Sequence, residues 1–382
     1  MTFFGSIGKK PTERIRIAID VGTHSIKAIV FTVPAAGTLP RVLKKLVFKL
    51  TATLSPIQKV SRLHEFLFNI IRELGIVPEK ITIALGPGLV EYDITTWTIT
   101  KPSGKRGIAK KDVTAIFQRL LVEHQDKYRL IVAIPLEILV NGYALKTDLP
   151  SKIPPAEISF RVILLYMPGV MGIALEEIKK SLGGMPINFT TLAACSREAI
   201  FRSFGEKEAL LVDVGGDEST LVFLKNRTVA EFAFFPAGAN DFLRMLARER
   251  HIGHAESETL MTQYIQNHLA PEIASSLELI LKNAATRWKK SFIDALDMLY
   301  NAGPLPQEIY CFGGGVNQPE IYRTISDADW MADRSHITRP SVRILNASDL
   351  FGGNSLEGFL QGPEEVGLAS LMLYSLYHEP PF

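Results

Sequence analysis

The sequence predicts an α/β protein made of two similar lobes that face one cleft. Near the start, two apolar and β-branched runs within Ile15–Val30 flank a short polar turn after Asp20, which is typical of a β-hairpin. The same design returns in Ala209–Leu224, where an apolar strand again ends in Asp-Val-Gly. A third turn, Gly313–Gly315, follows the short apolar run 309–312. Two equivalent hairpins and a glycine-rich turn, in this order, indicate two half-domains around a shared site.

Length and composition fit this architecture and exclude several classes of protein. A chain of 382 residues with 47% hydrophobic and 21% charged residues is long enough for two globular lobes with cores of their own. A formal net charge of +2 gives no case for nucleic acid as the main partner. Cys195 and Cys311 lie in unrelated segments without metal-ligand spacing, so we expect a reducing cytosol. The most membrane-like run, Val162–Leu175, contains Pro168 and is too short to span a bilayer, and we expect no signal peptide.

The first turn has the residue types that bind phosphate. Asp20 ends the first strand, where a carboxylate is suited to holding a hydrated Mg²⁺ ion. Gly22 lacks a Cβ atom, so a phosphate can approach the backbone, and Thr23 and Ser25 offer hydroxyl groups and turn amides. The alternative is an ordinary hairpin, in which the same residues only stabilise the turn. In the third turn, the glycines would let a base or ribose lie against the backbone.

Hydrophobic periodicity predicts the elements between the two hairpins. Val60, Leu63, Leu67 and Ile70 recur at three and four residues and predict a helix over 57–74. The other elements expected here are strands at 41–50, 80–85 and 90–99, a basic loop at 101–107, a helix at 110–124, strands near 128–134, 137–145 and 157–165, a helix at 170–182, a strand at 186–189 and a helix at 192–204. The part from 89 to 167 is thus a compact α+β insertion.

The second half of the chain alternates in the same way. Pro271 begins a long helix that we expect to reach about 301, with Leu277 and Leu281 on one face. The remaining elements expected are a strand at 228–235, a turn at 236–241 that leads into a helix, a helix from 255, a helix after the glycine-rich turn, a strand at 342–345, a loop at 351–362 and a closing helix within 363–377.

The ordered set of turns resembles the actin-like ATPase superfamily: first phosphate loop, second phosphate loop, adenosine loop. Over residues 14–377 the chain is most similar to the FtsA/PilM branch of bacterial cell-division and pilus-assembly proteins. The short lead Met1–Lys10, the stretch from Ile134-Pro135 to Asn141-Gly142-Tyr143, and Val366-Gly367-Leu368-Ala369 also resemble this branch. The resemblance implies a two-lobed actin-like fold with a small α+β insertion of the SHS2 type in the first lobe.

Carried over to this sequence, the resemblance implies both a domain plan and a set of site residues. The segments would be 13–88 (subdomain 1A), 89–167 (the insertion, 1C), 168–205 (the rest of 1A with a linking helix), 206–245 (2A), 246–304 (helical 2B), 305–348 (the rest of 2A) and 349–382 (a loop and closing helix returning to the first lobe). Asp20 and Asp213 would hold Mg²⁺ through water. The residues expected to bind ATP are Asp20, Gly22, Thr23, Ser25, Lys27, Gly215, Gly216, Ser219, Thr220, Gly238, Asn240, Glu256, Gly313, Gly314, Gly315 and Asn317. Asp213 and Glu198 would be the catalytic carboxylates, although a solvated helix face explains Glu198 more simply.

Two departures from the family pattern leave the activity open. Asp217 and Glu218 stand where a small residue and a hydroxyl are usual, and Thr259 replaces the lysine of an Ala-Glu-x-x-Lys segment. Two carboxylates beside a triphosphate would repel it. The chain is therefore either an adaptor that binds ATP and hydrolyses it slowly or not at all, a pseudo-ATPase scaffold, or, less readily, a sugar or acetate kinase.

The resemblance also implies partners and a location. It implies self-association and docking of a cytoplasmic peptide from a membrane protein or from a division or pilus component. The protein would be cytoplasmic and peripheral to the inner membrane, which it would reach through that partner and not by a span of its own.

Overall fold

The first lobe is built on a five-stranded mixed sheet. We describe a computed structural model of the chain, which covers residues 13–378 except 36, 51–53, 76, 87, 101–114, 116, 120–121, 124–129, 145–156, 168, 184, 206–207, 300–303, 328 and 331–338. The strand order is β3 (Val42–Lys49), β2 (Ser25–Thr32), β1 (Ile15–Val21), β4 (Lys80–Leu85) and β9 (Ile187–Thr190). β1 pairs antiparallel with β2 and parallel with β4, so the carboxyl ends of β1 and β4 lie at the same edge.

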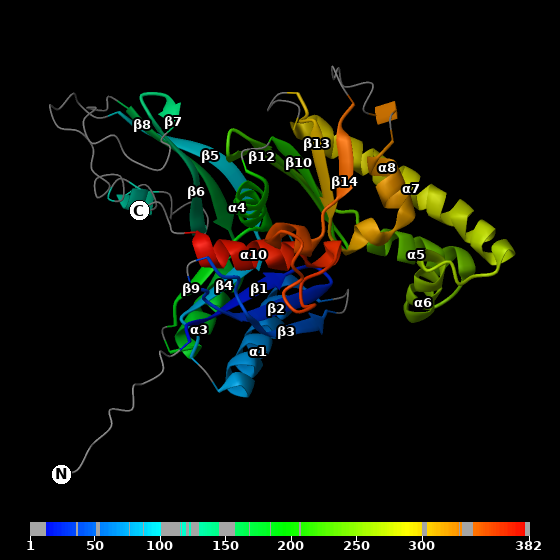
Figure 1. The fold of residues 1–382 in the computed structure, drawn as a ribbon, viewed down its shortest axis with the longest axis horizontal. Coiled ribbons are helices and arrows are strands. Elements are labelled where there is room, and N and C mark those ends of the chain that lie inside the picture. Colours follow the sequence, from blue (N-terminus) through cyan, green and yellow to red (C-terminus); the bar gives the residue numbers. More distant parts are fainter. Residues whose placement is uncertain are drawn as a thin grey trace, which may run out of the picture.

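The second lobe repeats this sheet strand for strand. Its order is β12 (Thr228–Phe235), β11 (Ser219–Lys225), β10 (Ala209–Val214), β13 (Glu308–Phe312) and β14 (Ser341–Ile344). β10 pairs antiparallel with β11 and parallel with β13, as β1 does with β2 and β4. The predicted architecture of two similar α/β lobes is confirmed, and Figure 1 shows both sheets.

The insertion in the first lobe has a sheet and a small core of its own. The strand order is β5 (Glu91–Thr100), β8 (Glu157–Tyr166), β6 (Leu130–Val140) and β7 (Tyr143–Ala144). Trp97, Phe117 and Phe160 pack together at its centre, with ring centroids 5.8 Å and 5.6 Å apart. The predicted basic loop and most of the predicted helix at 110–124 lie outside the described residues, as does the lead Met1–Lys10.

One prediction for the insertion was wrong. We expected separate strands near 128–134 and 137–145. The structure instead has one long strand, β6, which continues through Pro135 and then turns at Asn141-Gly142 into the two-residue strand β7. The pairing of β6 with β8 shifts in register between Pro135 and Glu137, and such a bulge tolerates a residue without an N–H donor.

Four helices cover the first sheet. They are α1 (Pro56–Leu74), α3 (Gly169–Ser181), α4 (Leu192–Phe204) and α10 (Val366–Tyr377). α1 begins with a capping box in which Ser55 and Gln58 satisfy each other's backbone N–H groups. α10 is apolar on nearly every side and is buried against α4 and β1, which returns the end of the chain to the first lobe.

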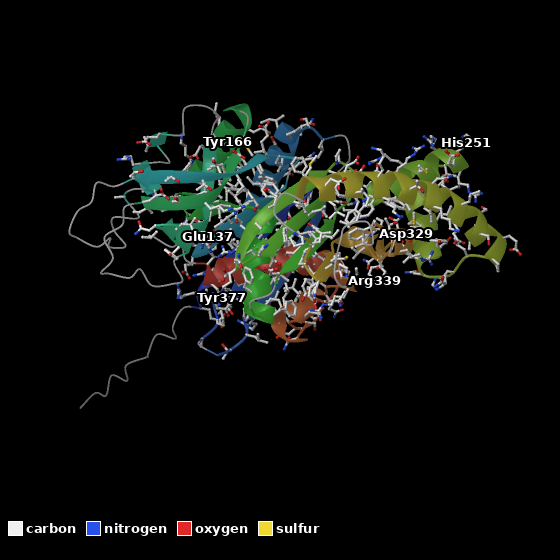
Figure 2. The ribbon with its side chains drawn as sticks, turned by 90° about the horizontal axis from the view of Figure 1, so that it is seen from above. Glu137, Tyr166, His251, Asp329, Arg339 and Tyr377 are labelled. Carbon is white, nitrogen blue, oxygen red and sulfur yellow. The ribbon has the colours of Figure 1, made fainter. Side chains whose placement is uncertain are left out.

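The second lobe carries the helices α5 (Ala239–Arg250), α6 (His254–Ile265), α7 (Pro271–Leu299) and α8 (Pro319–Ile325). α7 packs on the sheet through Trp288, which stacks on Phe292 and meets the edge of Phe235. The helix expected directly after the glycine-rich turn starts as a 3₁₀ turn, Gly314–Asn317, before Pro319 begins α8. In Figure 2, His251 at the end of α5 lies far from Glu137 and Tyr166 of the insertion.

Within the part of the chain that the structure describes, no helix combines the length and apolar character needed to cross a membrane.

Candidate functional site

A cavity of about 380 Å³ lies where the two lobes meet. Its walls come from the two hairpin turns, the glycine-rich turn and the residues just before and within α10. The residues on the wall are Asp20, Val21, Gly22, Thr23, His24, Ser25, Lys27, Leu85, Gly86, Tyr92, Thr191, Leu192, Ala193, Asp213, Gly215, Gly216, Glu218, Thr220, Phe232, Ala239, Asn240, Gly313, Gly314, Gly315, Glu364 and Gly367. This volume is in the range of small-molecule sites.

The two hairpin turns have the same backbone bond. The N–H of Gly22 donates to the carbonyl of Ser25 at 3.0 Å, and the N–H of Gly215 donates to the carbonyl of Glu218 at 3.0 Å. The backbone after Asp20 therefore turns in the same way as the backbone after Asp213. Each turn places its aspartate on the cavity wall from its own lobe. The pseudo-symmetry seen in the sheets extends to the residues of the site.

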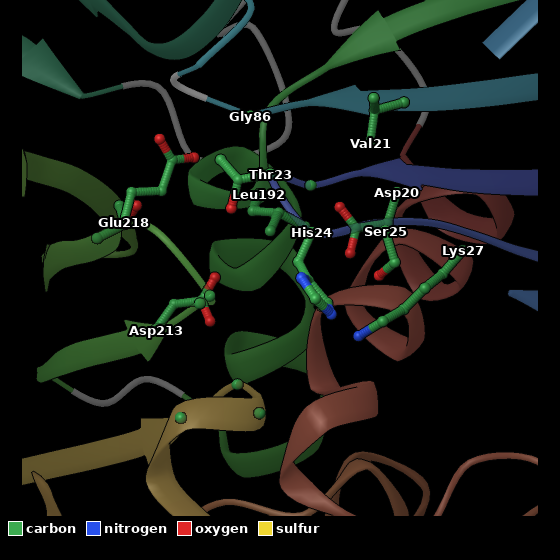
Figure 3. Close-up of a pocket in the computed structure, with 18 of the residues that line it drawn as sticks. Asp20, Val21, Thr23, His24, Ser25, Lys27, Gly86, Leu192, Asp213 and Glu218 are labelled. Atoms are coloured by element: carbon green, nitrogen blue, oxygen red, sulfur yellow. The ribbon is translucent and has the colours of Figure 1, made fainter. Parts of the chain in front are cut away.

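Three carboxyl groups, those of Asp20, Asp213 and Glu218, point into the cavity (Figure 3). Burial raises the pKa of Asp20, although Lys27 opposes the change. Burial, together with the charge of Asp20, raises the pKa of Asp213 to about 7. Burial also raises the pKa of Glu218 to about 7, against the attraction of Lys59 and a hydrogen bond from the Gly88 backbone. Near neutral pH, Asp213 and Glu218 are thus partly protonated, whereas ordinary carboxyl groups would be ionised.

Asp217 behaves differently from its neighbour Glu218. Its carboxylate accepts hydrogen bonds from Arg244 at 2.7 Å and from Asn240 at 3.0 Å, and it does not line the cavity. Burial would raise the pKa of Asp217, but these hydrogen bonds outweigh burial and lower it. Of the two carboxylates in this turn, only that of Glu218 would therefore repel a triphosphate.

Lys27 joins the first hairpin to the end of the chain. Its ammonium group donates to the backbone carbonyl of Glu364 at 2.6 Å, while the N–H of Gly313 donates to the carbonyl of Pro363 at 2.9 Å. The segment before α10 thus bridges the first hairpin and the glycine-rich turn. Lys27 is also the cation that opposes the raised pKa values of Asp20 and Asp213.

The structure explains the three glycines of the third turn in different ways. A Cβ atom on Gly313 would lie 2.4 Å from Asp213 Oδ1, and the φ of this residue is +90°. A Cβ on Gly315 would lie 2.4 Å from Val214 Cγ1. A Cβ on Gly314 would meet its nearest neighbour, Glu364 Cβ, only at 3.9 Å, and Gly314 lines the cavity. Gly313 and Gly315 are therefore required because they pack closely against β10. Gly314 is not required for packing and leaves room for a ligand beside its backbone.

Solved structures of other proteins share this architecture, whereas no family model and no curated protein matches the sequence. A chain of the PilM–PilN type IV pilus biogenesis complex is similar over 95% of this chain and 99% of that one, with a TM-score of 0.61 and 14% identity. A diol dehydratase-reactivating factor in nucleotide-free form is similar over 96% and 100%, with a TM-score of 0.51 and 9% identity. The chain has the actin-like ATPase fold.

A third structure is more distant. MreB5 of Spiroplasma citri bound to AMPPNP matches over 95% of this chain and 96% of that one, with a TM-score of 0.48 and 12% identity. At these identities the similarities concern the fold, and the chemistry of this chain has to be argued from its own residues.

The actin-like fold brings most of the sequence-predicted site residues onto one wall. Those that line the cavity are Asp20, Gly22, Thr23, Ser25, Lys27, Asp213, Gly215, Gly216, Thr220, Asn240, Gly313, Gly314 and Gly315. Their assembly follows from the duplicated sheet, because β1 and β10 end at the interface between the lobes.

Five sequence-predicted residues lie off this wall. Glu198 forms an ion pair with Arg202 along α4, and Glu256 accepts the N–H of Gly253 at the start of α6. The other three have structural contacts: Ser219 Oγ donates to the carbonyl of Ala237 at 2.7 Å, Gly238 precedes α5 with no room for a Cβ atom, and Asn317 donates to Glu364 at 3.4 Å.

Sequence reasoning did not assign several residues of the wall to the site. Tyr92 comes from the insertion, and Glu364 and Gly367 come from the end of the chain. A Cβ on Gly367 would lie 3.5 Å from Asp20 Oδ2, an ordinary contact distance, so this glycine lies directly beside Asp20. The only available signal was Gly367 itself, which belongs to the motif that resembles the closing helix of the family.

The donor set suits a hydrated ion better than a directly ligated one. Among the described residues, no group of three or more metal-ligating side chains is close enough to bind a metal ion directly. Asp20 and Asp213 face the same space from opposite lobes, which fits a Mg²⁺ ion that keeps most of its waters. Their carboxyl groups would lose protons as the ion binds.

Proposed function

We propose that this protein is an actin-like, nucleotide-binding adaptor that associates with itself and docks a partner in a membrane-linked assembly. The partner would be a cytoplasmic peptide of a membrane protein or a component of pilus assembly or cell division. The protein would then be cytoplasmic and peripheral to the inner membrane. The similarity to a chain of the PilM–PilN type IV pilus biogenesis complex supports the adaptor role, since that chain is in a complex with a partner.

The observation that carries the nucleotide proposal is the pair of equivalent aspartate turns on either side of one cavity. Phosphate groups would lie between the backbone amides and hydroxyl groups of Gly22, Thr23 and Ser25 and those of Gly215 and Thr220. Gly216, Asn240 and Lys27 complete this part of the wall. The adenosine would lie near Gly313–Gly315, where Gly314 leaves the backbone open.

Mg²⁺ between Asp20 and Asp213 would neutralise part of the triphosphate charge. With Mg²⁺ bound, Asp213 would be ionised and could accept a proton from a water molecule near the terminal phosphate. We assign this role to Asp213 rather than to Glu198, whose carboxylate is engaged with Arg202. Hydrolysis would be slow at most, because Asp213 shares its cavity with two other carboxyl groups.

A scaffold without nucleotide is the second candidate, and Glu218 is the observation that favours it. Its carboxyl group lies in the space that phosphates would need, and it accepts a hydrogen bond from Gly88 of the other lobe. Glu218 could therefore hold the two lobes together in place of a phosphate group. The two candidates share fold and partners and differ only in what fills the cavity.

Calorimetry with ATP separates the candidates. We expect the wild-type chain to bind ATP in the presence of Mg²⁺ and to release phosphate slowly or not at all. The control is Asp213→Asn, which removes the proposed metal contact while preserving side-chain size. Absence of binding at millimolar ATP in both proteins would reject the nucleotide adaptor and leave the scaffold. Sedimentation velocity with and without ATP tests self-association separately.

A further inference from the structure

A second cavity lies in the other lobe, between α5 and α7. Its volume is about 320 Å³, and it is formed by one face of each helix together with the end of β12. On α5 and on α7 the wall residues recur at three and four positions, so each helix contributes a continuous stripe. These stripes are Asp241, Arg244, Met245 and Arg248 on α5, and Ala284, Arg287, Trp288 and Ser291 on α7. Figure 1 shows the two helices side by side.

The floor and the rim of this cavity differ in character. Met245, Ala284 and Trp288 are buried and form an apolar floor. Above them stand the side chains of Arg244, Arg248 and Arg287, all on exposed positions. An apolar floor with a few polar groups at the rim is the usual design of a small-molecule site.

The arginines are only partly compensated. Arg244 bonds to Asp217 and Asp241, each at 2.7 Å, and Arg248 bonds to its neighbour Glu249 at 2.6 Å. Arg287 has no ion pair or hydrogen bond with any described residue. Three carboxylates, those of Asp217, Asp241 and Glu249, thus accompany Arg244 and Arg248, and the guanidinium group of Arg287 is the one on the wall that lacks such a partner among the described residues. Arg244 and Arg248 are also four residues apart on one helix, where like charges are mutually unfavourable.

We propose that this cavity, which we call the α5–α7 pocket, binds a small organic phosphate, with the phosphate held by Arg287 and Arg248 and the organic body on the floor of Met245, Ala284 and Trp288. A phosphate monoester carries nearly two negative charges at neutral pH, which suits the unpaired guanidinium group of Arg287. The guanidinium fork binds two phosphate oxygens at once. The Ser291 hydroxyl lies on the same wall and can donate a further hydrogen bond.

The test is calorimetric titration of the full chain with phenyl phosphate, which joins a phosphate monoester to an aromatic body. We expect saturable binding, tighter than that of inorganic phosphate because only the ester covers the apolar floor. Arg287→Gln should weaken it at least about tenfold, as expected for the loss of a charge-assisted contact. The matched control is Arg250→Gln, because Arg250 is an exposed arginine of α5 outside the pocket.

Two results would overturn the proposal. One is equal binding by wild type and Arg287→Gln, which would place the ligand elsewhere, the cavity between the lobes included. The other is the absence of binding by wild type. Ala284→Leu provides a second probe, since it fills the floor without changing charge and should weaken phenyl phosphate more than inorganic phosphate. Its melting temperature shows whether the variant is folded. This pocket does not depend on whether the inter-lobe cavity binds nucleotide.

Discussion

Arg244 donates a hydrogen bond to the carboxylate of Asp217 at 2.7 Å, and this contact separates the two acidic residues of the second turn. Asp217 is held on the outside by Arg244 and Asn240, and its pKa is lowered. Glu218 points into the cavity instead, and burial raises its pKa. Of the two acidic side chains in the turn, only Asp217 is therefore neutralised by a bonded arginine. The two residues should differ in their effect on nucleotide binding.

The first prediction concerns Glu218. Glu218→Thr removes the carboxyl group from the cavity and should raise ATP affinity about tenfold, which corresponds to about 1.4 kcal/mol. Asp217→Asn, the matched control, should change affinity by less than about twofold, because Arg244 already offsets that charge and part-exposed ion pairs are worth little. Isothermal titration in the presence of Mg²⁺ measures both. A larger gain from Asp217→Asn than from Glu218→Thr would contradict this assignment.

The contrast between these residues shows what the sequence could and could not reveal. The aspartate turns are local sequence patterns, so they could be recognised directly. Their position between two duplicated sheets could be inferred from the expected pairing of the strands. The contact between Asp217 and Arg244 joins a turn to the next helix and has no local signature. The same holds for Tyr92 and Glu364, which reach the cavity from the insertion and from the chain's end. The apolar character of α10 indicated burial, but not that the segment before it would receive Lys27.

The second prediction is a pH dependence of stability. The pKa of Glu218 is about 7 in the folded chain and near 4.5 when unfolded, so the folded state binds more protons between these values. Its ionisation therefore costs stability as pH rises. Glu218→Gln should raise the free energy of unfolding more at pH 7.5 than at pH 5.5, where the wild-type carboxyl is mostly protonated.

Urea denaturation of wild type and variant at both pH values measures this difference. Comparing the two proteins removes the opposing contribution of His378, whose pKa burial lowers to about 4. The exposed Glu91 supplies the control: Glu91→Gln should have the same effect at both pH values. A gain from Glu218→Gln that is equal at the two pH values would show that Glu218 is already ionised in the folded chain.

The third prediction concerns the metal. Asp20→Asn removes one of the two carboxylates proposed to hold hydrated Mg²⁺, so ATP affinity in Mg²⁺ should fall at least about tenfold. In the presence of EDTA the variant should bind ATP no worse than wild type, because a negative charge has been removed from the cavity. Asp294→Asn, on the exposed part of α7 beside Lys290, is the control and should behave as wild type. A loss that is the same with and without Mg²⁺ would remove Asp20 from the metal site.

The last prediction separates the glycines of the third turn. Gly313→Ala would place a methyl group 2.4 Å from both Asp213 Oδ1 and the Val214 carbonyl, at a φ of +90° that L-residues rarely adopt. Because the obstacles are β10 and its aspartate, they cannot move without disturbing the centre of the second sheet, and the cost should be at least about 2 kcal/mol. Gly314→Ala meets its nearest neighbour only at 3.9 Å and should change stability by less than about 0.5 kcal/mol. Denaturant unfolding measures both changes in stability. Because Gly314→Ala should remain folded, nucleotide titration of this variant then tests whether a ligand contacts the backbone at Gly314. Weakened ATP binding by this stable variant would support the proposed adenosine position, whereas unchanged binding would move the adenosine away from Gly314.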